Sequence, residues 1–220
     1  MSNLCYSPPA DTGLDVIFHD DAMIVVNKPS GLLSVPGRGP DKQDCMISRV
    51  QARFPDALIV HRLDMETSGI LLLARGKAVH RSLSRAFQER EVEKQYTAMV
   101  AGVLPQSEGE VDLPLICDWP NRPRQKVDHE QGKPSLTRYR RLSYDAKLGA
   151  TRVALFPVTG RSHQLRVHML SLGHAIVGGP LYAATTVQEM APRLLLHASH
   201  LSIQHPMTND RVVLRCEAPF

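Results

Sequence analysis

Apolar residues occur along the chain in short runs that are interrupted by polar turns, a pattern typical of β-strands. Residues 16–18 and 23–26 form two such runs on either side of a polar His-Asp-Asp segment and predict a hairpin. Further strands are expected at residues 57–60, 70–74, 94–102, 137–142, 151–156, 194–203 and 212–215. The pattern therefore predicts a chain rich in strands.

Apolar residues repeat at helical spacing in fewer places. Helices are predicted at residues 42–54, 77–90 and 162–172. In the third helix, Leu165, Met169 and Leu172 would form the buried side, and Gly173 would end it at the position where glycine is common. The Pro- and Gly-rich residues 27–37 and 119–127 predict loops.

These elements predict an α+β fold with a mostly antiparallel or mixed sheet, because strands outnumber helices and hairpin-like neighbours dominate. The 220 residues match one large domain, and no linker divides them. We expect a single domain over residues 1–220, with a short N-terminal extension at residues 1–13. Hydrophobic residues make up 43% and charged residues 22% of the chain, a globular balance that excludes wholesale disorder.

Two features favour a cytoplasmic protein with no membrane partner. No apolar run approaches the roughly 20 residues that span a bilayer, and the N-terminal segment lacks the basic and apolar regions of a signal peptide. The four cysteines, Cys5, Cys45, Cys117 and Cys216, form no CxxC pair and are expected to be free thiols.

Basic residues are clustered, although the net charge is only +4. Residues 75–94 hold six lysines and arginines against three acids, and residues 118–141 hold seven against three. Clustered positive charge suits a polyanionic partner such as a nucleic acid. A solvated basic surface without a partner is the alternative that charge alone leaves open.

Asp64 is the first candidate for a catalytic group. It follows an apolar run directly and is flanked by His61, Arg62 and the small polar residues 67–69. A loop that leaves the end of a strand is a common place for a catalytic side chain. A carboxylate beside an arginine stays ionised and can act as a nucleophile or base. From the local sequence alone, the simpler interpretation is that Asp64 caps a turn and pairs with an arginine.

Metal and cofactor sites are not expected. His163, His168 and His174 are spaced by five and six residues, so they do not stack on one helical face, and no HExxH motif occurs. The chain also lacks a P-loop, a GxGxxG fingerprint and a GxSxG elbow. The sequence therefore predicts chemistry without a metal or a nucleotide cofactor.

Five ordered blocks carry a resemblance to a known family. Residues 61–69 read HRLDMETSG, which resembles the HRLDxxTSG motif of the RluA family of pseudouridine synthases. The other blocks are NKPSGLLSVPG at 27–37, EKQYTAMVAG at 93–102, TGRSHQLRVHMLSLGHAIVGG at 159–179 and PRLLLHA at 192–198. The resemblance runs from about residue 16 to the C-terminus, and no separate RNA-binding module of the S4 type precedes the first block. It implies a pseudouridine synthase fold.

The resemblance implies isomerisation of uridine to pseudouridine within RNA, with Asp64 as the essential carboxylate. The N1–C1′ bond breaks, the uracil rotates and a C5–C1′ bond forms, with no redox step and no cofactor. Asp64 could attack C1′, add to C6 of the base or abstract a ribose proton. The sequence leaves these three routes open.

The matched positions also imply roles for other residues. Arg166 would pair with Asp64 and keep it ionised. Tyr96 would stack on the target uracil. Arg62 would enter the space that the flipped base vacates. Leu195 or Leu196 would form an apolar wall behind the base.

The remaining candidates are expected to bind RNA less directly. Lys28, His61, Arg161 and His163 either contact RNA or support the loops of the site. The basic side chains in the second cluster and on the helix at 77–90 should contact RNA phosphates: Arg122, Arg124, Lys126, Arg85 and Arg90.

The substrate and two competing functions follow from the same pattern. The segments LICDWPNRPRQKV and MAPRLLLHA resemble small family members that act on a stem-loop shared by 23S rRNA and tRNA anticodon arms. A monomer is expected. The alternatives are an RNA glycosylase, which would release free uracil, and a non-catalytic RNA chaperone or ribosome-assembly factor, which would not need Asp64.

Overall fold

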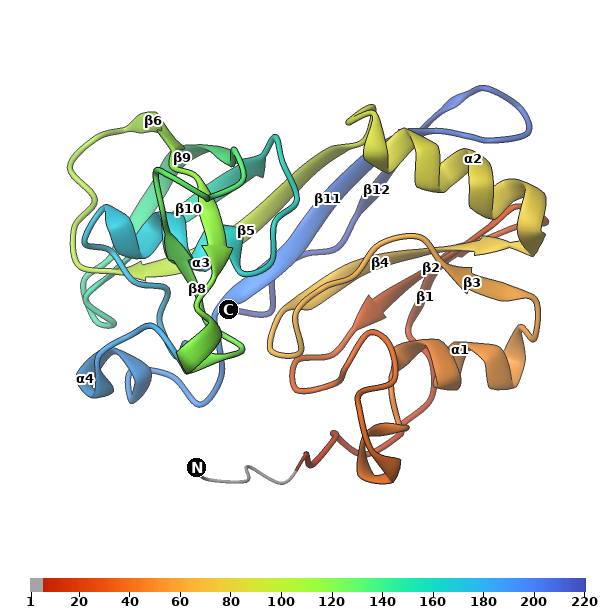
Figure 1. The fold of residues 1–220 in the computed structure, drawn as a ribbon, viewed down its shortest axis with the longest axis horizontal. Helices are drawn as coiled ribbons and strands as arrows, with labels where there is room; N and C mark the ends of the chain where they lie inside the picture. The colour runs from red at the N-terminus through yellow and green to blue at the C-terminus, as the bar shows by residue number, and fades with distance from the viewer. Residues whose placement is uncertain (1–5) are drawn as a thin grey trace. The chain divides into compact units, whose positions relative to one another are not determined.

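A computed structural model describes residues 6–220 and divides them into two compact units (Figure 1). Unit 1 comprises the described residues up to Glu93 together with Ala198–Ala218, and unit 2 comprises Lys94–His197 with the last two residues. The expectation of one domain over the whole chain stays a prediction. Cys5 lies outside the described residues; the other three cysteines are free thiols, as predicted. Among residues 6–220, no helix combines the length and the hydropathy that a membrane span requires.

Unit 1 is built on an antiparallel sheet. Its strands are β1 (Val16–His19), β2 (Met23–Lys28), β3 (Ala57–Ile59), β4 (Ser68–Arg75), most of β11 (Leu196–Gln204) and β12 (Arg211–Arg215). The pairs β1–β2, β2–β4, β3–β4 and β11–β12 are antiparallel, and β11 follows β4 in the sheet order. All residues of β4 except Arg75 are buried. A strand that is buried on both faces needs the continuous apolar run that the sequence shows there.

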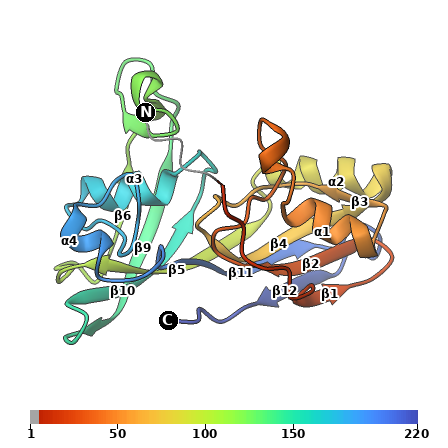
Figure 2. The ribbon, with the colours of Figure 1, turned by 90° about the horizontal axis from the view of Figure 1, so that it is seen from below.

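Two helices cover one face of this sheet (Figure 2). Helix α1 (Met46–Arg53) begins four residues later than predicted, after a short 3-10 turn at Pro40–Lys42. Its start is set by Cys45, whose backbone N–H donates to the Ser48 hydroxyl at 3.1 Å. Helix α2 (Gly76–Gln88) matches the prediction closely.

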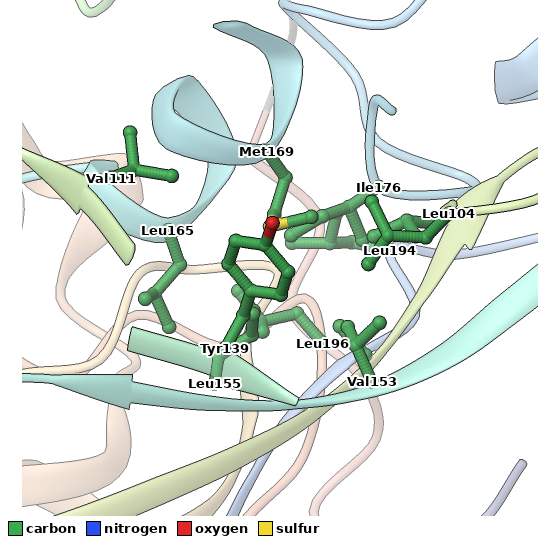
Figure 3. Close-up of a cluster of buried hydrophobic side chains, with 12 residues drawn as sticks. Leu104, Val111, Tyr139, Val153, Leu155, Leu165, Met169, Ile176, Leu194 and Leu196 are labelled. Carbon is green, nitrogen blue, oxygen red and sulfur yellow. The ribbon is translucent and has the colours of Figure 1, made fainter. Parts of the chain in front are cut away.

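Unit 2 is built on antiparallel strands in the order β5 (Glu93–Ala101), β10 (Ala150–Pro157), β9 (Leu136–Asp145) and β6 (Glu108–Asp112). Helix α3 (Gln164–Ser171) packs on it, and a short helix α4 (Thr185–Gln188) follows. In Figure 3, Leu165 and Met169 point from α3 toward Tyr139 on the sheet, and all three belong to one buried cluster. The strand-rich pattern and the antiparallel pairings confirm the predicted α+β class.

The segment at 119–127 is more ordered than the predicted loop. Strands β7 (Leu115–Cys117) and β8 (Gln125–Val127) form a hairpin, with a 3-10 turn at Trp119–Asn121 between them. Each strand has only three residues, and the two prolines between them made the segment look like a loop in the sequence. The hairpin, coloured green, projects beyond α3 in Figure 2.

Helix α3 differs from its predicted amphipathic form. It begins at Gln164 because the preceding His163 has a left-handed backbone, with φ of 54°. Leu172, expected on the buried side, is 37% exposed, whereas Arg166 and His168 are buried. The prediction for Leu172 was therefore wrong, since the helix is buried on nearly all sides. Gly173 ends the helix with φ of 83°, as predicted. Strand β6 and helix α4 were not predicted.

Candidate active site

Asp64 lies in the loop between β3 and β4 of unit 1, and its side chain is half-buried. The neighbouring Leu63 is buried and bonded twice to one serine: Ser34 donates to the Leu63 carbonyl at 2.7 Å and accepts from its N–H at 3.1 Å. On the other side, the N–H of Thr67 donates to the Asp64 carbonyl at 3.1 Å. These bonds fix the backbone on both sides of the carboxylate, while Arg62 is exposed.

Lys28 supports this loop through hydrogen bonds from its ammonium group. Its side chain is fully buried, and its ammonium donates to the carbonyl oxygens of Pro29, Leu32 and Met65 at 2.8, 2.6 and 3.0 Å. A lysine ammonium has three N–H donors, and these three carbonyls can accept all of them. Since Met65 directly follows Asp64, Lys28 ties the segment after β2 to the candidate catalytic loop. This arrangement favours the supporting role over direct RNA contact.

The ring of His61 is fixed by contacts with other residues of unit 1. Its Nε2 accepts the backbone N–H of Leu72 at 3.0 Å, and its ring stacks on Phe87 with 4.5 Å between centroids. Because Nε2 is an acceptor, the proton of a neutral imidazole is on Nδ1. These contacts anchor the start of the candidate catalytic loop to β4 and α2.

Gly69, the last residue of the HRLDMETSG block, is required by packing. Its φ is +109°, a conformation that residues with a Cβ rarely adopt. A Cβ built there would lie 2.4 Å from the carbonyl oxygen of Ala198 on β11. The glycine therefore allows β11 to pass close to the strand that follows Asp64.

In unit 2, Tyr96 is half-buried on β5 and packs against the main hydrophobic cluster. Its backbone is opposite Leu155 of β10 in the antiparallel register. Leu196 is buried within the same cluster. Leu195 belongs to a different buried cluster, with Met99 and Val177, because successive residues of an extended chain point to opposite faces.

Arg166 is the buried cation of α3, with 4% of its surface exposed. Its guanidinium donates to the carbonyl oxygen of Pro180 and lies over the ring of Tyr182, with 4.9 Å from its central carbon to the centroid. Both contacts restrict the guanidinium to one orientation.

Tyr182 joins several parts of this site and was not predicted. Its hydroxyl accepts the backbone N–H of Gln125 at 2.8 Å and lies 2.6 Å from Nδ1 of His163. The same residue therefore contacts Arg166, His163 and the basic hairpin. The only signal in the sequence was an aromatic residue within the Gly-Pro-rich turn that follows the apolar residues 175–177.

The expected phosphate contacts are on exposed surfaces. Arg122 and Arg124 are exposed on the hairpin, and Lys126 lies 3.7 Å from Asp128. Arg161 is exposed at the start of the α3 segment and donates to the Pro134 carbonyl at 3.3 Å. On α2, Arg85 pairs with Glu89 at 2.8 Å, while Arg90 follows the helix.

The candidate residues thus form one set in each unit. Unit 1 holds Asp64 with Arg62, His61 and Lys28, together with the expected phosphate contacts Arg85 and Arg90, and unit 2 holds the other predicted site residues. Within residues 6–220, no three or more histidine, cysteine, aspartate or glutamate side chains are grouped in a way that could hold a metal ion.

Comparisons with known proteins agree on one family. A family model described as RNA pseudouridylate synthase matches residues 22–171. The chain is 53% identical over 215 residues to the dual-specificity RNA pseudouridine synthase RluA of Escherichia coli (strain K12), covering 98% of both chains. It is 55% identical over 205 residues to the protein of the same name from Yersinia pestis, covering 93% of this chain and 99% of that one.

Solved structures give the same result. The human RNA pseudouridylate synthase domain containing 1 has a TM-score of 0.81 and 32% identity, over 97% of this chain and 87% of that chain. Human RNA pseudouridylate synthase domain containing 4 has a TM-score of 0.74 and 25% identity, over 93% and 88%. The chain belongs to the family of RNA pseudouridylate synthases.

Proposed function

We propose that this chain isomerises specific uridines to pseudouridine in structured RNA, with Asp64 as the essential carboxylate. Its family membership supports the reaction. The observation that supports the residue is the loop geometry: a half-buried carboxylate follows the buried, doubly bonded Leu63, and the Lys28 ammonium donates to the carbonyl of the next residue. A catalytic group needs this kind of fixed support.

The reaction is an isomerisation and needs no external reactant. The N1–C1′ bond breaks, a C5–C1′ bond forms, the C5 hydrogen leaves as a proton, and N1 gains a proton. Asp64 begins this sequence by attack at C1′, by addition to C6 or by removal of a ribose proton. Each route requires the ionised carboxylate.

The remaining roles are proposed from the family motifs. Arg166 supplies the cation that keeps the reacting carboxylate ionised, and Tyr96 stacks on the target uracil. Arg62 is exposed beside the catalytic loop, as a side chain that replaces a flipped base must be. Leu195 or Leu196 forms the apolar wall behind the base.

The proposed substrates are stem-loops in 23S rRNA and in tRNA anticodon arms. The curated relatives carry the words dual-specificity in their names, which supports two kinds of RNA substrate. Recognition of such loops depends on shape and on bases that have left the stack. We further propose a monomeric, single-domain, cytoplasmic enzyme, for which the free thiols Cys45, Cys117 and Cys216 suit a reducing compartment.

Release of tritium from RNA labelled at uracil C5 tests the proposal, because forming the C5–C1′ bond expels that hydrogen. Unmodified tRNA and fragments of 23S rRNA are offered separately to the native protein and to Asp64→Asn. Asp41→Asn, at an exposed acid of the 3-10 turn before α1, is the matched control. We expect release from both RNAs with the native protein and the control, and none with Asp64→Asn.

Other outcomes separate the alternatives. Release from one RNA alone would keep the reaction and narrow the substrate. Free uracil among the products would indicate a glycosylase. Tight RNA binding without release, unchanged in Asp64→Asn and repeated with other cellular RNAs, would indicate a chaperone.

A further inference from the structure

The hairpin β7–β8 carries an exposed aromatic side chain that the mechanism does not use. Trp119 is the single tryptophan of the chain, and 65% of its surface is exposed. The guanidinium carbon of Arg122 lies 4.7 Å from its ring centroid. The guanidinium lies over the ring, and most of the surface of Trp119 nevertheless remains exposed to solvent.

The turn that carries this pair is rigid. The N–H of Asp118 donates to the Arg124 carbonyl at 2.9 Å, and the N–H of Arg124 donates to the Asn121 carbonyl at 3.1 Å. The amide of Asn121 donates to the Asp118 carboxylate at 2.9 Å. These bonds fix the backbone of the turn from which Trp119 and Arg122 project, so binding has little backbone left to order.

The charge around the indole favours a polyanion. Arg122, Arg124 and Lys126 lie on the same hairpin, where Asp118 is the one acid between residues 117 and 127 and Lys126 pairs with Asp128 just beyond it. The Asp118 carboxylate is engaged by Asn121. An exposed aromatic face among cations is the arrangement with which proteins bind single-stranded nucleic acid, because every base has a face that stacks and every nucleotide has a phosphate.

We propose that Trp119 and Arg122 form a stacking platform for one unpaired base of the RNA substrate. The base lies on the open face of the indole, opposite the guanidinium, whose edge N–H groups can still donate to a phosphate. This platform rests on the proposed function for the identity of its ligand. It binds a base other than the isomerised uridine, for which Tyr96 is the proposed stacking partner.

Tryptophan fluorescence tests the platform directly, since Trp119 is the only source of the signal. The native protein is titrated with a tRNA anticodon stem-loop and with a blunt RNA duplex of the same stem, while filter retention measures binding independently. A stacked base quenches indole emission, so we expect quenching that saturates with the stem-loop and not with the duplex.

Variants provide the second measurement. We expect Trp119→Ala to weaken stem-loop binding by about 5- to 150-fold, the range that loss of one stacked base produces. Trp119→Phe, which keeps an aromatic face, should remain within about threefold of native affinity. The control is Met207→Ala, at another apolar side chain that is 65% exposed. Circular dichroism checks that each variant is folded.

Two results would overturn the platform: unchanged fluorescence at saturating stem-loop, or native affinity in Trp119→Ala. Fluorescence that changes with protein concentration in the absence of RNA, with native RNA affinity in Trp119→Ala, would instead assign the indole to contact with a second copy. Tritium release on the same samples separates this test from the proposed function. Tritium release without fluorescence quenching would contradict only the stacking platform. Quenching without tritium release would contradict only the proposed reaction.

Discussion

The ammonium of Lys28 donates a hydrogen bond to the carbonyl oxygen of Met65, at 3.0 Å, from a fully buried position. This bond links two segments that are 37 residues apart in the sequence, and it lies at the residue that directly follows the candidate catalytic carboxylate. Two further carbonyls, of Pro29 and Leu32, accept the remaining ammonium protons.

Replacing Lys28 with methionine should destabilise unit 1 and reduce turnover. Methionine fills similar space but donates nothing, and each buried carbonyl left unpaired costs about 1–3 kcal/mol. We expect a loss of at least about 2 kcal/mol in the free energy of unfolding, measured by urea denaturation, and a lower kcat with little change in RNA affinity. Lys77→Met, at an exposed lysine of α2, is the control and should change neither. A Lys28→Met variant with native stability and turnover would show that the three bonds do not position the loop.

Gly69 gives a prediction in which backbone strain and steric overlap can be separated. Gly69→Ala places a Cβ 2.4 Å from the Ala198 carbonyl oxygen at φ of +109°, whereas Gly13→Ala meets no atom within 4 Å at φ of +93°. We expect Gly13→Ala to cost about 1–3 kcal/mol of unfolding free energy from strain alone. Gly69→Ala should reduce the free energy of unfolding by about 1–3 kcal/mol more than Gly13→Ala, because the backbone of Ala198 must move to make room for the Cβ. Equal losses in the two variants, measured by urea denaturation, would mean that β11 can shift without penalty.

How far the sequence could predict this structure depended on the length of each element. Helix α2 and the hairpin β1–β2 were predictable because their periodic patterns extend over enough residues. The hairpin β7–β8 was not, since its short strands flank a turn with two prolines that is fixed by hydrogen bonds between loop residues. The predicted burial of Leu172 at the end of helix α3 was wrong, because burial there depends on tertiary contacts and not on the helical pattern.

The candidate site was also predictable only in part. The resemblance in sequence identified Asp64, Tyr96 and Arg166 as candidates because they fall within blocks of distinctive residues. It could not indicate that Tyr182 contacts Arg166, His163 and Gln125, since these contacts join residues up to 57 positions apart. Nor could it predict that Lys28 is fully buried, because burial of a charge depends on carbonyls that only the folded loop brings together.

His168 should make stability dependent on pH. Burial lowers its pKa below the usual 6.5, outweighing the opposite effects of the Leu113 carbonyl and Asp112. The neutral ring fits its partners: Nε2 donates to the Leu113 carbonyl at 3.1 Å, while Nδ1 accepts from Thr137, which itself accepts from Gln164. Below pH 6.5 the unfolded chain binds a proton that the folded chain does not, so stability falls as pH decreases toward the folded pKa.

We expect the free energy of unfolding to decrease as the pH falls below 6.5, measured as its pH dependence by urea denaturation. His168→Gln, which can keep a donor and an acceptor, should flatten the profile in this window. His129→Gln, at an exposed histidine, is the matched control variant. A native slope in His168→Gln would assign the pH dependence to other groups.

Tyr182 allows the roles of its hydroxyl and its ring to be separated. Tyr182→Phe removes the acceptor for Gln125 but keeps the ring beneath Arg166, so we expect a stability loss of about 0.5–1.5 kcal/mol with turnover near native. Tyr182→Leu also removes the ring face and should lower kcat by a further factor of about 2–30. Single-turnover assays at saturating RNA measure this difference. Equal kcat in the two variants would show that the ring does not position the arginine.

The basic hairpin should contribute to RNA affinity through phosphates, and the salt dependence of binding tests this. Replacing Arg122 and Arg124 together with alanine should weaken binding to all RNA sequences similarly and flatten the plot of log affinity against log salt by roughly one unit per contact. Lys147→Ala, at an exposed lysine in the turn between β9 and β10, is the control. Trp119→Ala should weaken binding without changing the slope, because stacking releases no counterions. An unchanged slope in the double variant would exclude phosphate contacts at both arginines, and any loss of affinity would then come from the stacking pair alone.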